Sequence, residues 1–166
     1  SDWSSDVCSS DLTAQLASGS AISGTPLQLQ AAAGMAANLV SPVTGSPSAV
    51  ITSPPNGNET NAWRSLGSLA NMLVPCTRDG ACDALLSATR TGGKGTTWSA
   101  TQQIARNPAR NVKRLFSLSN QQHLFQPYLT ARFGPAAPSK WTRLDAFTLA
   151  AKLNASGRET NGEEDC

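Results

Sequence analysis

The sequence predicts a mainly α-helical fold: a small irregular bundle of about four to five short helices with long loops and one possible C-terminal strand. Apolar residues recur at helical spacing in several short segments. The 10 prolines and 13 glycines fall mostly between these segments, where they favour turns. Only 14% of the residues are charged and only 5% are aromatic, so the core is expected to be thin.

Residues 2–12 match one reading frame of a common Illumina sequencing adapter, and the alternative interpretation is a Ser/Asp-rich tail. We therefore expect residues 1–12 to be a disordered, adapter-derived segment, with the natural N-terminus lying beyond this chain. Excluding it removes three of the 11 acidic residues and no basic residue, so the net charge rises from +2 to +5. Cys76, Cys82 and Cys166 are the cysteines that remain.

In the first half of the natural chain, the residue pattern predicts a loop over 13–26 and a helix over 27–40. Gly34 inside this helix suggests a close helix contact. Residues 41–58 form a Pro/Gly/Ser-rich connection in which 49–51 is a candidate short strand. The stripe expected to face inward in the helix consists of Leu29, Ala32, Ala33, Ala36 and Leu39 or Val40.

A second helix is expected from a cap at Thr60 or Asn61 to Val74, where Pro75 should end it. Its expected apolar stripe comprises Trp63, Leu66, Ala70 and Leu73, widened by Leu69 and Met72.

The loop 76–82 leads into a third apolar segment, 83–89, and residues 90–97 are expected to be flexible. A fourth helix is predicted over 98–106, and Asn107-Pro108 should begin a fifth that runs to Leu118. The residues expected to face inward are Trp98, Thr101, Ile104 and Ala105 in the fourth helix and Val112, Leu115 and Phe116 in the fifth.

Beyond Ser119 the pattern becomes irregular, and residues 147–153 alternate in the manner of a strand. We divide the natural chain into a helical module, 13–130, and a segment 131–166 that contains a linker and the start of a missing β-propeller. No capping or stop signal precedes Cys166, so the natural C-terminus is also expected to lie beyond this chain.

Four short motifs occur in order along the chain: 71–76, 82–86, 104–112 and 125–130, followed by Trp141. Together they resemble the helical N-terminal region of bacterial secreted proteins with NHL-repeat β-propellers, which are similar to streptogramin (virginiamycin B) lyases. The resemblance covers roughly residues 20–166 and implies a propeller as partner. No internal repeat of about 40–50 residues is present, and no lyase residue of the family finds a matching position here.

Cys76 and Cys82 flank a Gly-containing loop between two apolar segments. A disulfide that staples a helix hairpin is the favoured interpretation, and it would contribute about 2 kcal/mol. Two free buried thiols are the second possibility. A metal site is the third, although only His123 and Cys166 remain as further ligands and neither has metal-ligand spacing.

Arg106, Arg110, Lys113 and Arg114 form a basic helix face, interpreted either as a possible anion-binding face or as a solvated surface. No nucleic-acid motif accompanies it, so no nucleic-acid partner is expected. His123 has no nucleophile or orienting group at catalytic spacing. The stretch 92–97 departs from the phosphate-loop pattern, and no cofactor, metal or membrane span is expected.

These observations predict a non-catalytic structural or spacer module that precedes an NHL-type propeller in a secreted, periplasmic or cell-surface bacterial protein. Two alternatives stay open: a fragment of a streptogramin-lyase-like enzyme, and a binding module for an anionic surface polymer.

Overall fold

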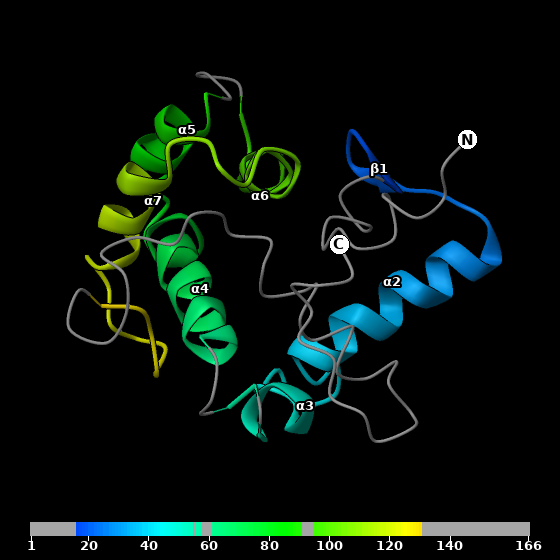
Figure 1. Ribbon diagram of the computed structural model, residues 1–166. Coiled ribbons are helices and arrows are strands. Elements are labelled where there is room, and N and C mark those ends of the chain that lie inside the picture. Colours follow the sequence, from blue (N-terminus) through cyan, green and yellow to red (C-terminus); the bar gives the residue numbers. More distant parts are fainter. Residues whose placement is uncertain (1–15, 55, 58–60, 91–94, 131–166) are drawn as a thin grey trace. The chain divides into compact units, whose positions relative to one another are not determined.

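The computed structural model describes residues 16–54, 56–57, 61–90 and 95–130, and its mainly helical architecture confirms the predicted fold class (Figure 1). The described residues divide after Trp63 into two compact units. Within the described residues, no helix is both long and apolar enough to cross a membrane.

The first unit opens with a small hairpin inside the segment that was expected to be a loop. Strand β1 (Ala17–Ser18) pairs antiparallel with β2 (Ala21–Ile22), and Gly19 between them adopts a positive φ of 58°. Strands of two residues are too short to produce a recognisable alternation in the sequence.

Helix α2 (Pro26–Leu39) confirms the first predicted helix. Thr25 caps it, because its hydroxyl accepts from the Gln28 N–H at 3.3 Å and its own N–H donates to Gln28 Oε1 at 2.9 Å. The predicted inward stripe is mostly wrong: Ala32 is buried and Leu39 is half-buried, but its other members are exposed. The buried residues of α2 are Ala32, Met35 and Asn38. This segment is apolar nearly all round, so its periodicity does not define one face.

Gly34 does not mediate the close helix contact that was expected of it. An added Cβ at Gly34 would meet no atom within 4 Å. The glycine therefore sits at an open position of α2, where a larger side chain fits.

The candidate strand at 49–51 is instead a short helix, α3 (Ala49–Thr52), which packs against α2. Ser48 begins it: its hydroxyl accepts from the Ile51 N–H and donates to the Asn38 carbonyl of α2. Ile51 is fully buried as a result. The serine cap and the contact with α2 outweigh the β-propensity of Val50 and Ile51.

Helix α4 (Ala62–Arg78) starts where a cap was predicted, but it continues through Pro75 for one further turn, so the predicted end is wrong. The Pro75 carbonyl accepts from the N–H groups of Asp79 and Ala81. Gly80 supplies the left-handed turn, with a φ of 66°. Proline lacks the backbone N–H that would bond within the helix. The hydrogen bonds that the Pro75 carbonyl accepts from the following turn offset the loss of that one donor.

Helix α5 (Asp83–Thr89) has the predicted bounds, and α6 (Thr97–Arg106) begins one residue earlier than expected. Thr96 caps α6, because its hydroxyl accepts from the Ser99 N–H at 3.1 Å. The buried residues of α6 are Ala100 and Ile104, whereas Trp98, which was expected to face inward, is 38% exposed. Residues 91–94 of the predicted flexible loop lie outside the described residues.

Helix α7 (Val112–Ser119) begins later than predicted. Asn107 ends α6 instead of starting α7, since its N–H donates to the Gln103 carbonyl. Asn111 takes the N-cap position with a left-handed φ of 52°. The predicted inward residues Leu115 and Phe116 do pack on the core.

Helices α4, α5, α6 and α7 belong to the second unit (Figure 1). Apolar residues of each of them form its core. Its buried members are Met72, Leu85, Ala88, Ala100, Ile104, Leu115 and Leu129. Leu129 belongs to the irregular segment that follows α7, so this segment is part of the core. The predicted strand at 147–153 lies outside the described residues.

Candidate functional site

Two polar side chains of α4 hold the irregular segment 120–130. Asn71 is fully buried: its Nδ2 donates to the Phe125 carbonyl at 3.0 Å, and its Oδ1 accepts from the Phe125 N–H at 2.8 Å. The Ser68 hydroxyl accepts from the Leu129 N–H at 2.9 Å. These bonds satisfy backbone groups that no helix or strand would pair. We call Ser68 and Asn71, together with Gly67, the α4 clamp.

Gly67 lets the segment approach the helix backbone. An added Cβ at this position would lie 2.0 Å from the Pro127 carbonyl oxygen, a distance that no side chain tolerates. Pro127 follows a cis peptide bond. The sequence reasoning missed the clamp, although a glycine, a serine and an asparagine beside the predicted apolar stripe of α4 were a visible signal. The residues of that stripe, Trp63, Leu66, Ala70 and Leu73, are only half-buried, whereas the three clamp residues are buried.

The clamp joins two motifs that were singled out separately in the sequence. Asn71 opens the motif 71–76, and Phe125 opens the motif 125–130. The structure therefore brings these motifs into direct contact through hydrogen bonds.

Cys76 and Cys82 form a disulfide with an S–S distance of 2.01 Å and a Cα–Cα distance of 4.4 Å, which confirms the favoured interpretation. It connects the last turn of α4 to the start of α5, and both cysteines pack against the core. The Thr97 hydroxyl lies 3.5 Å from the Cys82 sulfur, where it can donate to it. The staple therefore lies at the junction of α4, α5 and α6.

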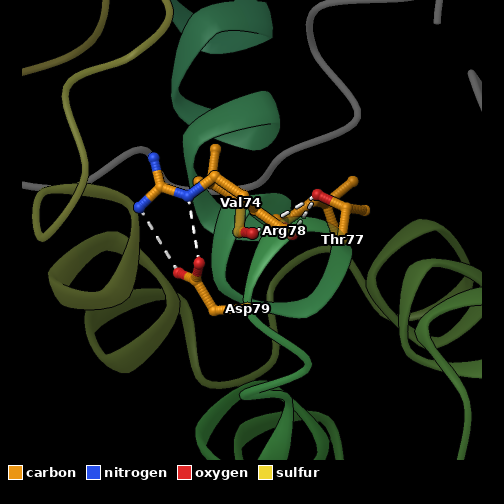
Figure 2. A network of polar contacts seen from close by, with 5 residues as sticks. Val74, Thr77, Arg78 and Asp79 are labelled. Atoms are coloured by element: carbon orange, nitrogen blue, oxygen red, sulfur yellow. Dashed lines mark hydrogen bonds and ion pairs between the residues drawn. The ribbon is translucent and has the colours of Figure 1, made fainter.

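Next to the disulfide, Arg78 forms a two-pronged ion pair with Asp79 (Figure 2). The side-chain hydrogen bond, and then the charge of Asp79, raise the pKa of Arg78 above its usual value. Thr77 turns its hydroxyl back to the carbonyls of Leu73 and Val74. Because Arg78 and Asp79 are both exposed, the pair contributes little to stability.

The predicted basic residues occupy the end of α6, the following turn and α7. Arg106 is the last residue of α6, Arg110 lies in the turn, and Lys113 and Arg114 belong to α7. All four are exposed, as predicted.

The structure adds Arg90, which sequence reasoning missed, to the neighbourhood of this basic surface. Arg90 is the exposed C-cap of α5. Asn111 Nδ2 donates to the Ala88 carbonyl at 2.7 Å, and Arg114 Nη2 donates to Ser87 Oγ at 3.1 Å. These two bonds connect the start of α7 to the end of α5, although the two helices are far apart in the sequence.

His123 contributes to the packing of segment 120–130. Its ring stacks on Tyr128, with centroids 4.9 Å apart, and Nε2 lies 3.0 Å from the Asn120 carbonyl oxygen. Among the described residues, no three His, Cys, Asp or Glu side chains gather in a way that could hold a metal ion.

A scan against protein-family models, a search of curated proteins and a search of solved structures each find no match.

Proposed function

We propose that this chain is a non-catalytic structural module that holds the chain leading to an NHL-type β-propeller in an exported bacterial protein. The observation that carries this proposal is the α4 clamp, which fixes the backbone of the segment from which the chain continues beyond Thr130.

A spacer can set the position of a following domain only if its last segment is rigid. Segment 120–130 has no regular secondary structure, so its rigidity must come from tertiary contacts. The bonds to Asn71 and Ser68 anchor it at Phe125 and Leu129, and Leu129 is buried in the core. The segment therefore leaves the helical unit at a defined place.

The disulfide supports an exported location. The described part of 64–130 is small, and small units with thin cores commonly gain stability from disulfides. Such bonds persist in oxidising compartments, which include the periplasm and the cell exterior. The secreted, periplasmic or cell-surface location is thus part of the proposal.

The sequence of the parent gene beyond the codon for Cys166 tests the partner. Repeats with a period of about 40–50 residues and four strands each support the proposal. A continuation without such repeats would contradict it.

A gene product that continues into such repeats would also separate the structural role from the enzymatic alternative. If the helical module is structural, Asn71→Ala lowers the stability of the module and leaves any lyase turnover by folded protein unchanged. A loss of turnover in protein that remains folded would favour the enzymatic alternative.

A further inference from the structure

We propose that the surface formed by Arg90, Arg110, Lys113 and Arg114, with Arg106 at its edge, binds a linear phosphate-bearing polymer. We call this surface the basic face. Its four central residues are exposed and come from three places in the chain: the end of α5, the turn after α6, and α7.

The described part of this unit has far more basic than acidic residues. The acidic residues in the described part of 64–130 are Asp79 and Asp83, and Asp79 pairs with Arg78 next to the disulfide. Asp83 begins α5 whereas Arg90 ends it, which separates them by about 10 Å along the helix axis. Asp83 also lies one helical turn before Ser87, to which Arg114 bonds, so it is the described carboxylate nearest to the basic face. Among the described residues, it forms no ion pair with Arg90, Arg110, Lys113 or Arg114. The basic residues of the same region are Arg64, Arg78, Arg90, Arg106, Arg110, Lys113 and Arg114.

The backbone beneath the basic face is held in place. Asn111 joins α7 to the Ala88 carbonyl, and Arg114 reaches the Ser87 hydroxyl across the junction of the two helices. A guanidinium group has several N–H donors, so the bond to Ser87 leaves donors for phosphate oxygens. Basic groups held on a rigid scaffold lose less conformational freedom when they bind a polyanion.

The composition of the face favours a polymer over a lipid surface. Helices that bind membranes present large apolar side chains beside their basic ones. The exposed large apolar residues in the described part of this unit are Trp98, Leu124 and Phe125, and none of them belongs to the basic face. Trp98 lies in the first turn of α6, at the opposite end from Arg106.

The choice of a surface polymer over a nucleic acid rests on the proposed export, because phosphate-bearing polymers are a major polyanion of an oxidising bacterial envelope. Binding to purified polymer is measured independently of export and of the propeller. Polymer binding can therefore be found even if the proposed function is wrong. The proposed function can likewise be correct even if no polymer binds.

The test titrates the full chain with inorganic polyphosphate of defined length at 50 mM salt and follows binding by calorimetry. The double variant Arg110→Gln/Lys113→Gln removes two charges from the basic face and spares the Arg114 bond to Ser87. The matched control, Arg64→Gln/Arg78→Gln, removes two charges elsewhere in the unit. Thermal unfolding of both variants verifies that they are folded.

We expect the basic-face variant to bind about tenfold more weakly and with a shallower dependence on salt, because each phosphate contact releases a counterion. The control should bind within about twofold of the original chain. Equal losses in both variants would show that net charge alone drives binding, and would overturn the proposal. Absence of binding at 50 mM salt would also overturn it.

Anionic vesicles of phosphatidylglycerol and a short DNA duplex serve as competing ligands. Tighter binding to either of them than to polyphosphate, with the same loss in the basic-face variant, would overturn the assignment to a linear polymer. Preference for polyphosphate supports it.

Discussion

The side chain of Asn71 in α4 forms two hydrogen bonds with the backbone of Phe125, which lies 54 residues further along the chain. An amide side chain carries a donor and an acceptor in one plane, so it can pair with an N–H and a carbonyl as a neighbouring strand would. Asn71 is fully buried, so its own amide has no water as an alternative partner at this contact.

Replacing Asn71 by alanine should lower the free energy of unfolding by about 2–4 kcal/mol, because two backbone groups lose their partners. Asn71→Asp keeps an acceptor for the Phe125 N–H but turns a carboxylate toward the Phe125 carbonyl, so it should also destabilise. Urea unfolding measures both changes. The control is Gln121→Ala at an exposed position of the same segment. A loss no larger than that of the control would contradict the role of the clamp.

Gly67 and Gly34 should respond to alanine in opposite directions. Gly67→Ala places a Cβ against the Pro127 carbonyl and should lower Tm by many degrees or displace the segment. Gly34→Ala meets no atom within 4 Å and should stabilise α2 by about 0.5–1 kcal/mol. Thermal unfolding of the two variants provides the comparison, and a Gly67→Ala protein as stable as the original would refute the close approach.

Removing the disulfide should reduce stability by about 2 kcal/mol, because a short loop contributes modest chain entropy. The double variant Cys76→Ala/Cys82→Ala and the reduced original protein should lose similar amounts. Urea unfolding with and without reductant separates the bond from other effects when Cys8 and Cys166 are also replaced by serine, since reductant should then leave the double variant unchanged. In protein recovered from an oxidising compartment, non-reducing mass spectrometry should find the two cysteines linked. Two alkylated thiols there would argue against the staple.

Asn111 combines a left-handed backbone with a hydrogen bond to Ala88, and two substitutions separate these roles. Asn111→Gly keeps the backbone conformation and loses the bond. Asn111→Ala loses both, so it should be less stable than the glycine variant by about 1 kcal/mol. Equal stabilities of the two variants, measured by denaturant unfolding, would show that the backbone conformation has no cost at this position.

Deleting residues 1–12 should leave Tm unchanged, because we expect this segment to be adapter-derived and to contribute nothing to packing. The control is the unmodified chain, measured in the same buffer. A fall of several degrees would mean that these residues belong to the folded protein.

Local rules in the sequence determined where most helices begin and which cysteines meet. Thr25 and Thr96 cap α2 and α6 by bonding residues three positions ahead, so their effect is visible in a short window. The apolar run after Cys82 predicted α5 with its observed bounds. Cys76 and Cys82 are close in sequence, and a tight Gly-containing turn brings them together.

Only the tertiary structure decided the features that depend on distant residues. The buried face of α2, the helical state of 49–52 and the continuation of α4 through Pro75 all differ from the local patterns. The α4 clamp and the bond from Asn111 at the start of α7 to the Ala88 carbonyl of α5 join residues far apart in the chain. A short stretch of sequence contains only one partner of each such contact. The free energy of burying a polar group depends on whether the fold places the other partner within hydrogen-bond distance.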